Sequence, residues 1–114
     1  MDNKPETTAF CPQYHRAVEL IGRRWTGAIL RALMSDVQRF SELRCTIPGL
    51  SDKMLSERLK ELEAEGIVIR AVTADTPVKI EYSLTAKGRS LENVVTAVGR
   101  WAEQWAASSS VSRR

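Results

Sequence analysis

The clearest hydrophobic pattern in the chain lies within residues 51–65. Leu55, Leu59 and Leu62 recur at a spacing that places them on one face of an α-helix, and most of the positions between them are polar or charged. Ser51 can cap such a helix, because its hydroxyl can accept a hydrogen bond from an early backbone N–H. The segment is therefore predicted to be an amphipathic helix with one buried face.

A second, shorter helix is predicted to begin near Phe40 and to end before a corner at Pro48 and Gly49. Proline cannot continue a helix, and glycine can adopt the backbone angles that a sharp corner needs. Gly66 lies where the helix over 51–65 is expected to stop. Two helices joined by a tight turn of this kind are typical of a helix-turn-helix unit.

Two β-prone runs follow, at residues 67–72 and 79–84. The six residues between them include Asp75 and Pro77, which are common in turns, so we expect a hairpin. Gln38 and Arg39 are expected to add a short strand beside it. A helix-turn-helix followed by a hairpin is the order of a winged helix.

Three further helices complete the pattern, at 11–22, 25–34 and 85–105. Trp25 is interpreted as a packing residue rather than a ligand platform.

The last helix, about 30 Å long at 1.5 Å per residue, has an apolar stripe longer than one small domain can cover. A second copy of the chain is the simplest cover, which predicts a two-fold dimer. The expected interface residues are Tyr14, Val18, Val94, Val98, Trp101 and Trp105.

The predicted fold class is mainly α with a small β wing (α+β), a winged helix-turn-helix with a long C-terminal dimerisation helix. Residues 1–10 are expected to form a flexible arm, 11–107 the winged helix-turn-helix domain with its terminal dimerisation helices, and 108–114 a flexible tail. At 114 residues the chain is long enough for one domain.

Several segments, in this order, resemble the HxlR-type transcriptional regulators, winged-helix proteins related in architecture to the MarR group. The matching segments are 11–12, 21–26, 39–43, 47–55, 58–63 and 78–89. The resemblance implies a homodimer that binds an operator in double-stranded DNA, expected to be pseudo-palindromic. The sequence departs from the family at Arg23, where a second glycine is more common, and at Cys45, where a basic residue is common.

The outward face of the helix over 51–65 is short, polar and partly basic, which suits entry into a DNA major groove. An ordinary amphipathic surface helix is the alternative for this segment, and a winged-helix protein–protein interaction module is the alternative function. Lys53, Arg58 and Lys60 supply positive charge on the helix; the net charge of +3 adds little. Arg70 and Lys79 are candidates for phosphate contacts, or simply solvated strand charges. The expected DNA-binding residues are Ser51, Lys53, Met54, Ser56, Glu57, Lys60, Arg39, Arg70 and Lys79.

Cys11 is the candidate sensor, because the start of a helix favours a thiolate over a thiol. Some members of the family that this chain resembles sense quinones, aldehydes or oxidants through a cysteine at the matching place, so a small electrophile or another small effector is an expected partner. The alternative for Cys11 is a small, half-buried hydrophobic residue. Cys45 is expected to face the core; the alternative is that it faces outward, where its oxidation would perturb the DNA-binding unit directly.

Other chemistry is not indicated by the sequence. Two cysteines and one histidine cannot build a four-ligand protein zinc site. No cofactor is expected, and His15 is interpreted as structural because no nucleophile–base set accompanies it. We expect a non-enzymatic protein of the cytoplasm, since no leader or membrane-spanning run is recognised.

Overall fold

The computed structural model describes residues 9–112, and the side chains of residues 9–106. Within this part the chain forms helices and one two-stranded sheet, so the predicted class, mainly helical with a small β wing, is confirmed. The elements are α1 (Pro12–Ile21), α2 (Thr26–Met34), α3 (Phe40–Thr46), α4 (Asp52–Ala64), β1 (Val68–Thr73), β2 (Lys79–Leu84), α5 (Ala86–Arg89) and α6 (Glu92–Ser112).

The hydrophobic core lies among α2, α3, α4 and the base of the hairpin. Leu55, Leu59 and Leu62 are almost fully buried, which confirms the predicted stripe of α4. They pack in one cluster with buried residues of the other elements, among them Ile29, Leu30, Leu43, Ile67 and Val68. Burial of this apolar surface holds α4 in place and leaves its opposite side toward solvent.

The corner between α3 and α4 has the predicted form. Ile47 has extended backbone angles ahead of Pro48, and Gly49 has a φ of +84°, a value that glycine adopts without strain. The Ser51 hydroxyl accepts a hydrogen bond from the Met54 N–H at 3.1 Å and caps α4. A Cβ at Gly49 would lie 3.5 Å from the Trp25 ring, and Trp25 is half-buried against the core, as expected of a packing residue.

The wing is an antiparallel hairpin in which Val68 pairs with Leu84 and Thr73 with Lys79. The predicted third strand is present as a single bridge between Arg39 and Glu81. The Tyr82 N–H also donates to the Gln38 carbonyl at 2.8 Å. These contacts join the start of α3 to the wing.

The predicted single helix over 85–105 is wrong, because the chain forms α5 and α6 with a break between Ser90 and Leu91. Thr85 caps α5, and Gly88 packs so closely on the carbonyl of Ile67 that a Cβ there would overlap it. This packing ties α5 to the base of the wing, and the helix restarts in a new direction as α6. Helix α6 continues past Trp105 into the predicted tail and ends at Ser112. The predicted arm falls largely on residues outside the described part of the chain.

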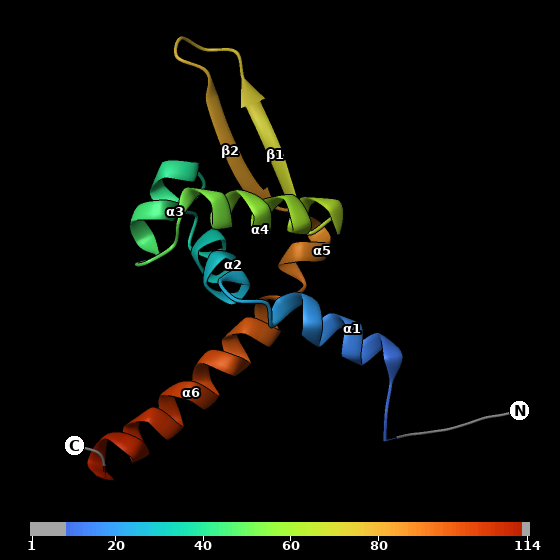
Figure 1. Ribbon diagram of the computed structural model, residues 1–114, viewed down its shortest axis with the longest axis vertical. Helices are drawn as coiled ribbons and strands as arrows, with labels where there is room; N and C mark the ends of the chain where they lie inside the picture. Colours follow the sequence, from blue (N-terminus) through green and yellow to red (C-terminus); the bar gives the residue numbers. More distant parts are fainter. Residues whose placement is uncertain (1–8, 113–114) are drawn as a thin grey trace, which may run out of the picture.

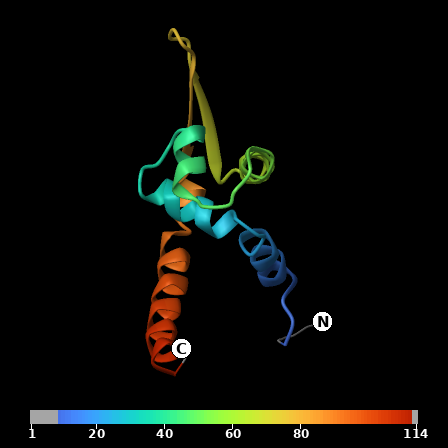
Figure 2. The same ribbon diagram turned by 60° about the vertical axis from the view of Figure 1, so that its left-hand side comes forward.

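The wing and the two terminal helices project from opposite ends of the helical body (Figure 1). Helices α1 and α6 diverge below α2 as two separate arms, an arrangement that is also visible after a 60° turn (Figure 2). Helix α1 has no buried residue. The body and wing therefore form the packed unit, and the two arms leave it with uncovered faces.

Candidate nucleic-acid interface

Helix α4 presents a short polar face opposite its leucine stripe. Lys53, Glu57 and Lys60 are exposed on this face, whereas Met54 and Ser56 are half-buried. Ser51 is exposed at the start of α4, but its hydroxyl is already engaged in capping. The exposed charges are of both signs, so this face is polar rather than strongly basic.

Arg58 is not part of that face, so of the three basic residues of α4 only Lys53 and Lys60 present their charge to solvent. Arg58 is only 8% exposed, because it follows Leu55 by three residues and precedes Leu62 by four. Residues at those spacings share one side of a helix. The same spacing could have revealed its burial from the sequence, and we missed the signal.

Basic side chains near α4 come from α3 and from the wing. Arg39 lies 3.8 Å from a carboxylate oxygen of Glu81, and Arg44 forms an ion pair with Asp52 at the start of α4. Arg70 and Lys79 are exposed on the hairpin, which extends beyond α4 (Figure 1). The structure thus brings a polar helix and a charged wing to one end of the body.

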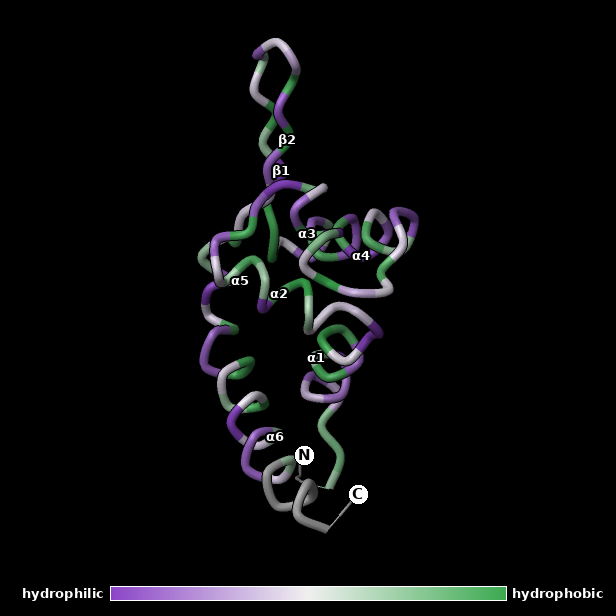
Figure 3. Tube along the Cα trace, turned by 90° about the vertical axis from the view of Figure 1, so that its left-hand side faces the viewer, coloured by the Kyte–Doolittle hydropathy of each residue, from purple (hydrophilic) through white to green (hydrophobic). Residues whose placement is uncertain are grey.

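All six predicted interface residues are exposed hydrophobic side chains of α1 and α6. We call this set the α1–α6 apolar surface: Tyr14 70%, Val18 42%, Val94 40%, Val98 60%, Trp101 65% and Trp105 53% exposed. Tyr14, Val18, Val94 and Val98 line a groove of about 570 Å³ between the two helices. Hydrophobic turns of α6 lie on its side toward α1 (Figure 3). Exposed tryptophans on this scale are unusual for a monomer.

Cys11 lies at the N-cap of α1, as predicted, and is exposed. The Tyr14 N–H donates to its Sγ at 3.5 Å, and the side chains of Phe10 and His15 stack nearby, with ring centroids 5.3 Å apart. The thiol is therefore accessible in the single chain and lies one turn from the α1–α6 apolar surface.

The expectation that Cys45 faces the core is wrong, because Cys45 is exposed. Leu43 and Ile47 occupy the buried side of α3. In the sequence, Cys45 is two residues from each of them. At about 100° per residue it lies about 200° around the helix from Leu43, away from the buried side. A second accessible thiol therefore lies on the helix-turn-helix unit itself.

Two other kinds of site are absent from the described residues. No helix within residues 9–112 is long and apolar enough to cross a bilayer. In the same part of the chain, no three His, Cys, Asp or Glu side chains gather as a metal site would require.

Comparison with known proteins gives a consistent result. Residues 20–110 match the model of the HxlR-like helix-turn-helix family. The chain is 48% identical over 95 residues to the HTH-type transcriptional regulator YodB of Bacillus subtilis, covering 83% of this chain and 85% of YodB. It is 47% identical over 95 residues to YvaP, an HTH-type transcriptional regulator of the same organism, covering 83% and 88%.

Solved structures show the same fold. The reduced form of YodB from B. subtilis matches with a TM-score of 0.75 over 83% of this chain and 93% of that one. The reduced form of the redox regulator HypR matches with a TM-score of 0.77 at 38% identity, over 81% of this chain and 91% of that one. The family match, the curated relatives and the winged-helix geometry agree, and this chain belongs to the HxlR-like helix-turn-helix family of transcriptional regulators.

Proposed function

We propose that the protein is a homodimeric transcriptional regulator that binds a specific operator in double-stranded DNA. The observation that carries the proposal is the polar face of α4, where Lys53, Glu57 and Lys60 are exposed beside a wing that bears Arg70 and Lys79. A helix of this width fits the major groove, where base pairs present distinct donor and acceptor patterns. Exposed basic residues of the wing suit the flanking phosphates, which position a protein without reading sequence.

Met54 and Ser56 are half-buried at the edges of this face and are also proposed to contact DNA. Ser51 caps the start of α4 through its hydroxyl. The ion pair of Arg39 with Glu81 is exposed on both sides, so Arg39 can exchange its carboxylate for a phosphate at small cost. Lys53 and Lys60 are the α4 residues best placed for hydrogen bonds to base edges or phosphates.

The dimer forms through the α1–α6 apolar surface. A two-fold axis pairs the same patch on both protomers, so every contact made by Trp101 or Trp105 occurs twice in the assembly. The dimer then presents two α4 helices to successive major grooves, about 34 Å apart along the duplex. The operator is accordingly expected to be pseudo-palindromic.

Cys11 is the proposed point of regulation. Solved structures exist of a diamide-treated YodB and of an oxidised HypR, and both proteins are relatives of this chain. In the present chain an electrophile would form a bond to the Cys11 sulfur as the thiol proton leaves. With an azo oxidant such as diamide, the Cys11 thiols of the two protomers would lose two electrons and two protons to form a disulfide, and the azo group would become a hydrazine.

A gel-shift titration on fragments upstream of the protein's own gene tests DNA binding. The assay is run at two salt concentrations and against a scrambled fragment of equal length and composition. Specific binding is expected to weaken steeply with salt, because phosphate contacts release counterions. Equal affinity for all fragments, or no shift at all, would instead favour a winged-helix module that binds another protein.

A further inference from the structure

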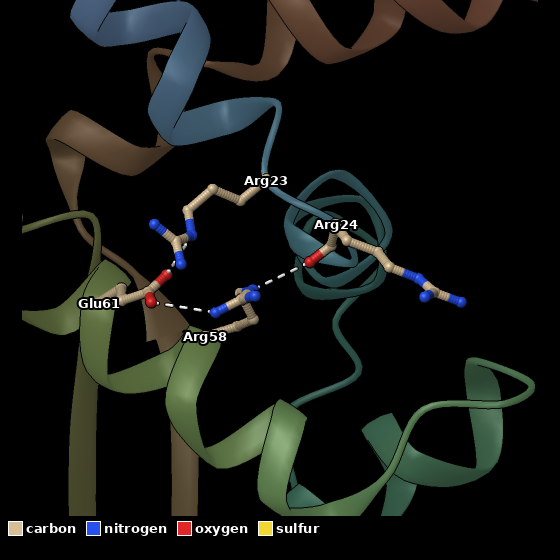
Figure 4. Close-up of polar contacts among 4 residues, drawn as sticks. All are labelled: Arg23, Arg24, Arg58 and Glu61. Carbon is tan, nitrogen blue, oxygen red and sulfur yellow. Dashed lines mark hydrogen bonds and ion pairs between the residues drawn. The ribbon is translucent and has the colours of Figure 1, made fainter.

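A charged cluster, in which Arg58 is buried and Arg23 and Glu61 are partly exposed, connects α4 to the link that follows α1 (Figure 4). Arg58 of α4 is 8% exposed and donates two hydrogen bonds in different directions. Its Nε donates to the carbonyl of Arg24 at 2.9 Å, and its Nη1 donates to Oε2 of Glu61 at 3.0 Å. A planar guanidinium with donors in a fixed fork can hold two acceptors rigidly in this way.

Glu61 extends the cluster to a second arginine. Its Oε1 is shielded from solvent and has no hydrogen-bond partner in the described structure, but it lies 3.2 Å from Nε of Arg23. Two arginines thus share one carboxylate, and only the backbone of Arg24 takes part. The Arg24 side chain points away from the cluster (Figure 4). Its guanidinium carbon lies over the Trp25 ring, 4.8 Å from the ring centroid.

The link held by this cluster has an unusual backbone. Trp25 has a φ of +80°, which is uncommon for a residue with a Cβ and persists only where surrounding contacts hold it. The carbonyl that Arg58 binds belongs to the residue directly before Trp25. Arg58 therefore fixes the link at the point where its conformation is least favourable by itself.

Besides this link, α1 contacts the body through Leu20 and Ile21 at its C-terminal end, which are partly buried against the core. Helix α1 has no buried residue, and beside the cluster an open hollow lies between the end of α1 and α4, lined by Glu19, Leu20, Ala64 and Glu65 in addition to the two charged partners. Helix α1 also carries Cys11 and part of the α1–α6 apolar surface. A shift of α1 can therefore reach α4 through the link that Arg58 holds.

We propose that Arg58, with Glu61 and Arg23, is a positioning device that sets the orientation of α4 relative to α1, and so transmits changes at α1 to the DNA-reading face. This inference rests on the proposed function for its effect on DNA, although the coupling itself is a property of the free protein. Arg58 does not touch DNA in this account. Its role is to hold both α4 helices of the dimer at the spacing of the operator.

The test compares Glu61→Ala with Glu63→Ala, the same substitution at an exposed position two residues along α4. Both remove one negative charge, which by itself should tighten binding to any DNA. If the cluster positions α4, Glu61→Ala should instead bind operator about tenfold more weakly than Glu63→Ala, a factor that corresponds to about 1.4 kcal/mol. The two variants should bind scrambled DNA equally, and both are measured well below their melting temperatures so that lost stability does not contribute.

Hydrogen exchange in the absence of DNA provides the independent readout. The Thr26 amide donates to the Arg23 carbonyl at 3.0 Å and so reports on the link. Its exchange should be about tenfold faster in Glu61→Ala and unchanged in Glu63→Ala. Arg58→Lys keeps the positive charge but loses the planar guanidinium that donates to two acceptors at once. It should therefore show the weaker operator binding and the faster Thr26 exchange expected of Glu61→Ala.

The outcomes separate the two proposals. Unchanged exchange at Thr26 in both Glu61→Ala and Arg58→Lys would overturn the coupling, whatever the DNA result. Faster exchange with equal operator affinity of the two alanine variants would overturn the positioning of α4. If the parent protein itself does not distinguish operator from scrambled DNA, the proposed function fails, and the exchange rates still decide whether the cluster couples α1 to α4.

Discussion

Replacement of Trp101 by alanine should dissociate the dimer. Trp101 is 65% exposed in the single chain, on the same surface as Trp105 and Val98. A tryptophan side chain buries roughly 150–250 Å² when it is covered. About two thirds of that area, roughly 130 Å², is therefore available for burial by a partner protomer.

At about 25 cal/mol per Å², covering this area contributes about 3 kcal/mol for each protomer. A two-fold dimer carries the substitution twice, so the upper limit is about 6 kcal/mol, and coverage of half the area gives about 3 kcal/mol. Because about 1.4 kcal/mol corresponds to a factor of ten, the dissociation constant should rise by about 10²- to 10⁴-fold.

Sedimentation equilibrium over a range of protein concentrations measures this constant, and circular dichroism establishes that the variant is folded. The matched control is Ile69→Ala, which removes a 54% exposed hydrophobic side chain on β1, outside the α1–α6 apolar surface. The control should associate like the parent. A folded Trp101→Ala protein with the dissociation constant of the parent would refute the assignment of the interface to α6.

Five other substitutions, at one lysine, both cysteines and two glycines, have defined expectations. Lys53→Ala should weaken operator binding by about 1–3 kcal/mol in a gel-shift titration and leave the circular dichroism unchanged, and parental affinity would contradict the orientation assigned to α4. Cys11→Ser should bind operator like the parent but lose its response to diamide, whereas Cys45→Ser should keep it; a diamide response in Cys11→Ser would assign sensing to another group. Gly88→Ala should lower the free energy of unfolding by about 1–3 kcal/mol, because its Cβ would overlap the Ile67 carbonyl, whereas Gly27→Ala, with open space at its Cβ, should raise it by about 0.5–1 kcal/mol. Denaturant unfolding measures both, and equal values for the two glycine variants would contradict this account of α5.

Local signals in the sequence were sufficient for most of the fold. The leucine stripe of α4, the Ser51 cap and the Pro48–Gly49 corner each depend on residues close together in the chain, and all three were confirmed. The apolar residues of α1 and α6 that were expected to lie uncovered in a single chain are exposed. Their assignment to a dimer remains a proposal.

Features that depend on contacts between distant segments could not be predicted in the same way. The break between α5 and α6 follows from the approach of Gly88 to Ile67, which no local pattern reveals. The rotation of α3, which exposes Cys45, follows from how Leu43 and Ile47 pack. Arg58 is a different case: its spacing from Leu55 indicated burial, but its charge suggested a surface residue.

The most direct test of the central claim is a hydroxyl-radical footprint of the operator, combined with the mass of the complex measured by sedimentation. The account predicts two protomers per DNA and two protected segments on one face of the duplex, about 34 Å apart and related by two-fold symmetry. Lys53→Ala should remove both protected segments together. A single protected segment with one bound protomer, or protection that is uniform along the fragment, would contradict a dimer that reads its operator through two copies of α4.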